Sequence, residues 1–77
     1  MIEDNQWFSY ADIQLDPILQ YLIPNPNLPD HLRHIANVLA RTAADMLVEV
    51  PRSAERTTGF RKLLEAKDCF VRAALPD

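Results

Sequence analysis

Two arginines and three hydroxyl-bearing residues lie around a short break in the second half of the chain. Arg52 and Arg56 flank the predicted start of a helix, where free backbone N–H groups and the helix dipole already create a positive potential. Ser53, Thr57 and Thr58 add hydroxyl donors close to the same helix start. Cations and donors in this arrangement suit a phosphate group.

Two arginines beside a helix start are also explained by ion pairs within the protein. Arg52 or Arg56 could pair with Glu49, with Glu55, or with an acid of a neighbouring chain. Structural ion pairs are common, so the residue types alone favour this interpretation and leave the phosphate site open.

Four of the six aromatic residues lie in the first 23 positions: Trp7, Phe8, Tyr10 and Tyr21. A tyrosine ring stacks on a nucleobase with roughly 1–3 kcal/mol per base. Tyr21 leads directly into a proline-rich segment and is therefore the better-placed stacking residue. Trp7 and Phe8 are at least as well explained by packing at an interface between chains.

No set of residues in the sequence indicates catalysis. Asp30, His31 and His34 share part of a predicted helix, but zinc sites need three or four ligands, so we interpret them as a helix cap beside surface histidines. Cys69 has no identifiable base and is expected to be buried. Gly59 is the single glycine, so no glycine-rich phosphate loop is present. We expect no enzyme, no metal and no cofactor.

The composition predicts one small folded domain, residues 1–77, with 48% hydrophobic residues and a net charge of −3. Residues 1–30 hold five acids and no lysine or arginine, whereas residues 31–77 hold all eight basic residues. Because no basic stripe covers the chain, we expect no binding of long DNA or RNA. We also expect no signal peptide and no membrane helix, and therefore a cytoplasmic protein.

The N-terminal part is predicted to contain one short helix and a stiff linker. Within residues 1–23, Asp16 is expected to cap a helix near residues 16–23, with Pro17 in its first position. Residues 24–29 contain three prolines, which exclude a helix and favour an extended linker.

Residues 30–75 are predicted to form an antiparallel two-helix hairpin, which makes the fold all-α. Asp30 is expected to cap the first helix, Pro51 to end it, and Ser53 to cap the second helix, with Glu55 in its first turn. The predicted apolar stripe of the first helix is Leu32, Ile35, Leu39, Thr42, Met46 and Val50. The second helix is expected to bury Phe60, Leu63, Leu64, Phe70, Val71 and Ala74. Expected surface ion pairs are Arg61–Glu65 and Asp68–Arg72.

One hairpin has too small a core to be stable alone, and the single cysteine excludes an intrachain disulfide. We therefore expect the chain to form a homo-oligomer through its hairpin.

Residues 51–56 (PRSAER) and 61–67 (RKLLEAK) follow a pattern of Pro-x-Ser-x-Glu, a short gap, and Leu-x-Glu-Ala. In this order and spacing, residues 43–74 resemble the helical hairpin of phage anti-CBASS cyclic-oligonucleotide sponges, which also occurs in a class of phage anti-Thoeris sponges. A tyrosine that precedes a proline-containing segment in the family falls on Tyr21 without a gap. The resemblance thus covers about residues 21–75.

The resemblance implies a phage protein that traps immune messengers in the host cytoplasm without cleaving them. Members bind cyclic dinucleotides, and some bind cyclic trinucleotides; cyclic ADP-ribose isomers are a further candidate ligand. They form interlocked dimers and commonly hexamers, with ligands between protomers. By resemblance, Tyr21 stacks on a base.

Two positions depart from the family pattern. The family often has a basic residue after the isoleucine of the first helix, whereas here Ile35 is followed by Ala36 and Asn37. We therefore include Arg33 and Asn37 among the candidate ligand contacts. A basic residue linked to trinucleotide binding falls near Pro76, which favours cyclic dinucleotides as ligands.

The leading hypothesis is a cyclic-dinucleotide sponge that blocks CBASS-type antiviral signalling. Its candidate ligand contacts are Tyr21, Arg33, Asn37, Arg52, Ser53, Arg56, Thr57 and Thr58. The alternative is a helical, oligomeric protein-binding module that inhibits a host protein through its N-terminal aromatic segment.

Overall fold

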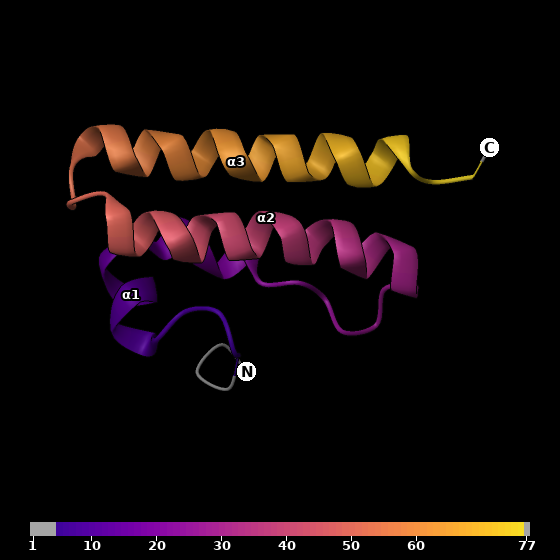
Figure 1. The fold of residues 1–77 in the computed structure, drawn as a ribbon, viewed down its shortest axis with the longest axis horizontal. Coiled ribbons are helices and arrows are strands. Elements are labelled where there is room, and N and C mark those ends of the chain that lie inside the picture. Colours follow the sequence, from indigo (N-terminus) through magenta and orange to yellow (C-terminus); the bar gives the residue numbers. More distant parts are fainter. Residues whose placement is uncertain (1–4, 77) are drawn as a thin grey trace.

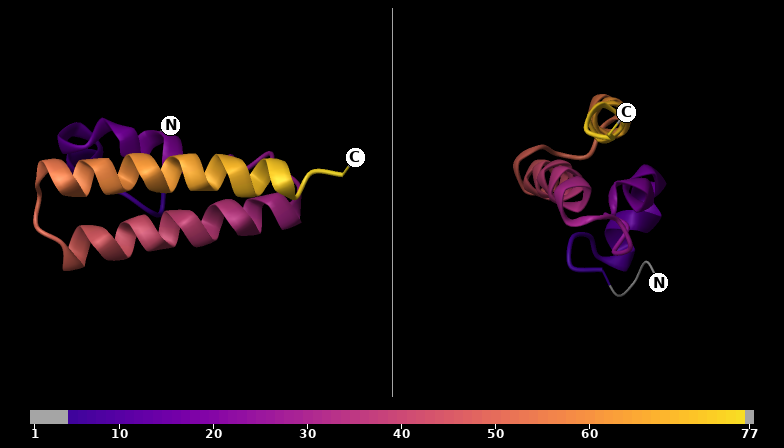
Figure 2. Two further views of the ribbon diagram at one scale, coloured as in Figure 1. Left: turned by 90° about the horizontal axis from the view of Figure 1, so that it is seen from above. Right: turned by 90° about the vertical axis from the view of Figure 1, so that its right-hand side faces the viewer.

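The computed structural model describes residues 5–76, and this part of the chain folds into helices. They are α1 (Tyr10–Leu15), the 3-10 helix η2 (Pro17–Leu22), α2 (Asp30–Glu49) and α3 (Ala54–Ala73). No strand occurs between residues 5 and 76, so the predicted all-α class is confirmed for the described chain. α2 and α3 lie side by side and run in opposite directions (Figure 1). η2 packs against both long helices (Figure 2).

α1 is an additional helix that begins at a reciprocal cap formed by Ser9 and Asp12. The Asp12 N–H donates to Ser9 Oγ at 3.0 Å, and the Ser9 N–H donates to Asp12 Oδ2 at 3.1 Å. Such a capping box satisfies two backbone donors that a helix start otherwise leaves free. α1 contributes Ile13 to the buried core.

The helix expected near residues 16–23 is present as η2, with Pro17 in its first turn. Asp16 occupies the N-cap position of η2, as predicted, but its side chain makes no capping hydrogen bond there. Its side chain is buried and turned toward α3. Leu19 and Leu22 of η2 are completely buried.

α2 begins at Asp30, so the prediction that Asp30 caps this helix is wrong. The cap position belongs to Pro29, without a side-chain hydrogen bond, and the Asp30 carboxylate pairs with Arg33 at 2.6 Å. Arg33 also donates to the carbonyl oxygens of Pro26 and Leu28, both at 3.4 Å. Arg33 therefore holds the proline-rich linker against the first turn of α2.

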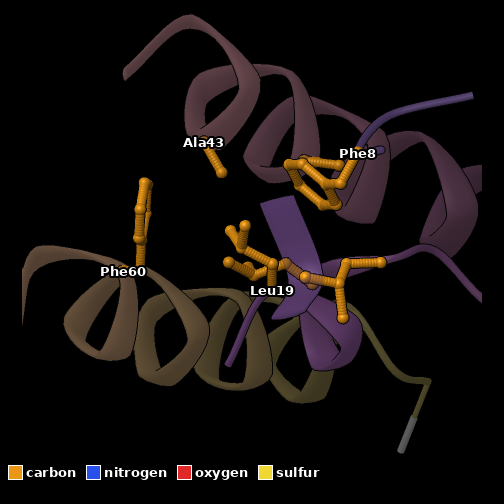
Figure 3. Packing of buried hydrophobic residues seen from close by; sticks show 7 residues of the cluster. Phe8, Leu19, Ala43 and Phe60 are labelled. Carbon is orange, nitrogen blue, oxygen red and sulfur yellow. The ribbon is translucent and has the colours of Figure 1, made fainter. Parts of the chain in front are cut away.

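The buried face of α2 differs from the predicted stripe. Its buried residues are Leu32, Ala36, Ala40 and Ala43. Small alanine side chains allow the neighbouring elements to approach closely, and Figure 3 shows Phe60 of α3 pointing toward Ala43, with Leu19 and Phe8 nearby. The larger residues Ile35, Leu39 and Met46 therefore lie at the edge of this face or outside it.

Only the first half of α3 enters the core. Phe60 is 2% exposed, and Leu63 and Leu64 pack against the same cluster. Phe70 is 58% exposed and Cys69 is also exposed, so the predicted burial of both is wrong for the single chain. Helical spacing correctly identifies an apolar face of α3, but the residues between 5 and 76 leave Phe70 on that face exposed.

The ion pairs on α3 are Lys62–Glu65 at 3.9 Å and Lys67–Asp68 at 3.2 Å. The described residues form neither of the predicted pairs, Arg61–Glu65 and Asp68–Arg72. Exposed pairs of this kind contribute little to stability, so the exchange of partners has a small effect.

One buried ion pair ties the N-terminal part to the long helices, and we call it the Asp16 clasp. The carboxylate of Asp16 accepts hydrogen bonds from Arg56 Nη2 at 2.8 Å and from Thr57 Oγ1 at 2.9 Å. Arg56 Nη1 also donates to the Val50 carbonyl oxygen at 2.9 Å, and its guanidinium lies 5.6 Å from the centre of the Phe60 ring. The clasp thus joins the start of η2, the end of α2 and the start of α3.

We expect Asp16→Asn to lower the free energy of unfolding by about 3–5 kcal/mol, because it leaves the buried Arg56 charge without its partner. The control is Asp30→Asn, which removes a pair whose acid side chain is 94% exposed and which should cost less than about 1 kcal/mol. Urea unfolding followed by circular dichroism, at one protein concentration, measures both. Equal effects of the two substitutions would contradict the importance of the clasp.

Candidate functional site

The predicted phosphate donors at the start of α3 surround a small polar hollow of about 300 Å³. It is lined by Arg52, Ser53, Ala54 and Thr57. Ser53 is the N-cap that the sequence predicts, since its Oγ accepts the backbone N–H of Arg56 at 3.0 Å. Arg52 is exposed and forms no ion pair with the described residues.

The other donors at the start of α3 already have partners within the chain. Arg56 and Thr57 both bind the Asp16 carboxylate, and Thr58 Oγ1 donates to the Ala54 carbonyl oxygen at 3.1 Å. The acid that compensates Arg56 is thus Asp16, 40 positions away, and not a neighbour in sequence. An internal carboxylate therefore binds two of the donors that were expected to bind a phosphate, Arg56 and Thr57.

Tyr21 lines a different and larger groove, of about 440 Å³, between the N-terminal part and the second half of α3. The tyrosine is 59% exposed, so its ring is accessible. The lining residues are Gln20, Tyr21, Ile23, Pro24, Asn25, Leu28, Ala36, Lys67, Asp68, Val71 and Arg72. The groove therefore combines an aromatic ring with apolar walls, side-chain amides and two cations.

The positive charge of the groove comes from α3. Lys67 pairs with Asp68 at 3.2 Å, and Arg72 donates a long hydrogen bond to Cys69 Sγ at 3.6 Å. Arg72 forms no ion pair with the described residues, so no acid between residues 5 and 76 compensates its charge. Ala36, which occupies the position after Ile35, lies in the same groove.

Arg33 and Asn37 do not line the Tyr21 groove. Arg33 is engaged by Asp30 and the linker carbonyl groups. Asn37 lies in a third hollow, of about 430 Å³, with Trp7 and Arg41 among its lining residues. The guanidinium of Arg41 lies 5.8 Å from the centre of the Trp7 ring, which is a cation–π contact.

The two cationic regions of α3 are far apart in one chain. Ala54 lines the hollow at the start of α3, and Asp68 lines the Tyr21 groove. At 1.5 Å per residue, these two positions are about 20 Å apart along the helix axis. A single small ligand therefore cannot contact Tyr21 and Arg52 of the same chain. The structure brings Arg52, Ser53 and Thr57 together, but it places Tyr21 in a separate site.

The sequence analysis did not select the two cations of the groove, Lys67 and Arg72. Both belong to a set at positions 67, 68, 71 and 72, a spacing that places side chains on one side of a helix. That pattern was visible in the sequence. It did not show that Tyr21 faces the same side of α3.

Among residues 5–76, no group of three or more histidine, cysteine, aspartate or glutamate side chains is arranged to hold a metal ion. The search of the same residues finds no helix with the length and hydropathy needed to cross a bilayer.

Comparison of the sequence with models of protein families gave no match, and comparisons with curated proteins and with solved structures gave none either.

We expect Ser53→Ala to lower the free energy of unfolding by about 1 kcal/mol, because it removes the hydrogen bond that caps α3. Ser53→Asp should keep most of the stability, since a carboxylate also caps a helix and suits its dipole. Urea unfolding of the two variants and the wild type measures the difference. An alanine variant as stable as the wild type would show that Ser53 does not act as a cap.

Proposed function

We propose that this protein is a sponge that binds cyclic dinucleotide messengers in the Tyr21 groove and does not cleave them. The observation that carries the proposal is that an accessible tyrosine ring lines the same groove as Lys67 and Arg72. By the family resemblance of residues 21–75, the consequence of binding is a block of CBASS-type antiviral signalling.

A nucleotide needs a surface for its base and a charge for its phosphate. Tyr21 offers a ring face for stacking, next to the apolar side chains of Ile23 and Pro24. Lys67 and Arg72 supply cations that attract phosphate oxygens. Lys67 is paired with Asp68 and Arg56 is paired with Asp16, so each site has one cation that is already bound. The Tyr21 groove is favoured because it also has an aromatic ring, which the hollow at the start of α3 lacks.

The position of Ala36 gives further support. The related sponges often have a basic residue at this place in the first helix, and the side chain here is only a methyl group. Ala36 lies in the groove together with Lys67 and Arg72. We infer that the charge of the missing basic residue is supplied from α3.

We also propose that the chain works as a homo-oligomer, from a dimer to a hexamer, built on the hairpin of α2 and α3. A further hollow, of about 460 Å³, supports this, because it is almost entirely apolar and shared by both helices. Its lining residues are His34, Ile35, Val38, Leu39, Phe70, Ala73 and Ala74. With Val38 50% and Phe70 58% exposed, a second copy is the occupant that would remove this surface from water.

The alternative function, a protein-binding module that uses the N-terminal aromatic residues, has less support. Phe8 is 3% exposed and belongs to the core, and Trp7 packs against the same cluster. Their side chains are therefore engaged in the fold of their own chain. Tyr10, 52% exposed, remains the accessible aromatic of that segment.

We expect isothermal titration calorimetry to show binding of at least one cyclic dinucleotide at micromolar or tighter affinity. The panel is cyclic di-AMP, cyclic di-GMP, the mixed guanosine–adenosine dinucleotide, cyclic tri-AMP and cyclic ADP-ribose. Tyr21→Ala should weaken binding about 5- to 150-fold, which corresponds to the loss of one stacked base. Denaturing the complex should release the ligand unchanged.

Arginine substitutions distinguish the two cationic regions of α3. Arg72→Gln should weaken binding at least about tenfold, because a charged hydrogen bond contributes about 1.5–3 kcal/mol. Arg61→Gln removes the same charge from an exposed position of α3 outside the groove and serves as the control. If Arg52→Gln abolished binding and Arg72→Gln did not, the ligand would sit at the start of α3 and the proposed groove would be wrong.

A further inference from the structure

The outer face of α2 carries a regular row of side chains, which we call the α2 stripe. Its members are His31, His34, Val38, Arg41, Asp45 and Val48, and all six are exposed. They follow one another at alternating steps of three and four residues, the spacing by which one helix packs lengthwise against another. The buried alanines of α2 lie on the opposite side of the helix. The stripe is therefore a helix face that no part of the described chain covers.

Apolar and charged members alternate in the second half of the stripe. Val38 is 50% exposed and Val48 is 83% exposed, and Arg41 and Asp45 lie between them. Arg41 contacts the Trp7 ring and forms no ion pair with the described residues. The Asp45 side chain forms neither an ion pair nor a hydrogen bond with them. Both charges are available to a partner.

We propose that two copies of the chain pair through the α2 stripe, with their α2 helices antiparallel and related by a two-fold axis near residue 43. In this register Arg41 faces the partner's Asp45, and Val38 faces the partner's Val48. Positions 41 and 45 have residue 43 as their midpoint, and so do positions 38 and 48. One antiparallel register therefore forms both pairings. The two-fold axis then repeats each contact, giving two ion pairs and two apolar contacts.

The charges decide the direction of the helices. In a parallel, in-register pair, Arg41 would face the partner's Arg41 and Asp45 would face the partner's Asp45. Like charges opposite each other across an interface cost several kcal/mol, which excludes this arrangement. The antiparallel register converts the same four side chains into two attractive pairs.

The surfaces beside the stripe fit the same partner. On one side, Trp7 supports the Arg41 guanidinium and limits its conformations before association. On the other side, the apolar hollow that contains Phe70 shares His34 and Val38 with the stripe. One partner could therefore cover the stripe and part of that hollow. The inference rests on the homo-oligomer of the proposed function and adds which helix faces meet and in which register.

Charge reversal with mixing tests the register. Arg41→Asp places two acids on the stripe and Asp45→Arg places two cations there, so each variant alone should associate at least about tenfold more weakly than the wild type. In an equimolar mixture the acidic stripe of one variant faces the basic stripe of the other, and association should return to within about threefold of the wild type. Sedimentation velocity over a dilution series measures the association, and circular dichroism confirms that each variant is helical.

Arg61→Asp and Glu65→Arg provide the matched control, because they reverse charges at the same spacing on exposed positions of α3. Neither control variant should change association, alone or mixed. A wild-type chain that stays monomeric, single reversals without effect, or a mixture that fails to recover would each overturn the proposed register.

Calorimetry on the same samples separates this inference from the proposed function. Arg41 and Asp45 lie outside the Tyr21 groove. If nucleotides bind the wild type but mixing does not restore association, the register alone is wrong. If association follows the predicted pattern but no nucleotide binds, the register stands and the sponge function is wrong.

Discussion

The buried ion pair between Asp16 and Arg56 is the constraint on which the rest of the structure depends. Asp16 is 2% exposed and the Arg56 side chain 10%, so each charge has lost its hydration and needs the other. The pair fixes the start of η2 against the start of α3. Tyr21 follows Asp16 by five residues of a 3-10 helix, less than two turns, so the clasp also determines where its ring meets α3. The groove is thus a consequence of a contact at the other end of η2.

The same contact changes the electrostatics of α3. Without Asp16, the helix start would hold two arginines, hydroxyl groups and free backbone donors, which together favour an anion. With Asp16 in place, Arg56 and Thr57 already bind a carboxylate, and Arg52 remains as an exposed cation. On α3, the cation that shares a groove with an exposed aromatic ring and pairs with no acid among residues 5–76 is then Arg72, in the second half of the helix. For this reason we place the proposed nucleotide site in the groove and not at the start of α3.

Local chemistry made part of this fold predictable. Pro51 lacks a backbone N–H and Ser53 caps α3, and both effects act within a few residues, so they identify the turn between the long helices. Both long helices have 20 residues, as the positions of these signals suggest. The capping box of Ser9 and Asp12 was equally local, and reading it would have identified α1. The contact of the Asp16 side chain was not predictable, because it is not local in sequence. The position of Asp16 before Pro17 is typical of a cap, but its carboxylate binds Arg56, 40 residues away, instead of the backbone of η2. Periodicity likewise places Phe70 on the apolar face of α3 but does not show whether residues of the same chain cover it.

The central claim is that a cyclic dinucleotide stacks on Tyr21 between η2 and the second half of α3. Solution NMR of the isotope-labelled protein, titrated with the tightest-binding cyclic dinucleotide, tests it most directly. The account predicts that the Tyr21 ring protons move upfield and that the largest amide changes fall on residues 20–25 and 67–72. Changes concentrated on residues 52–58, with the Tyr21 ring unaffected, would contradict it.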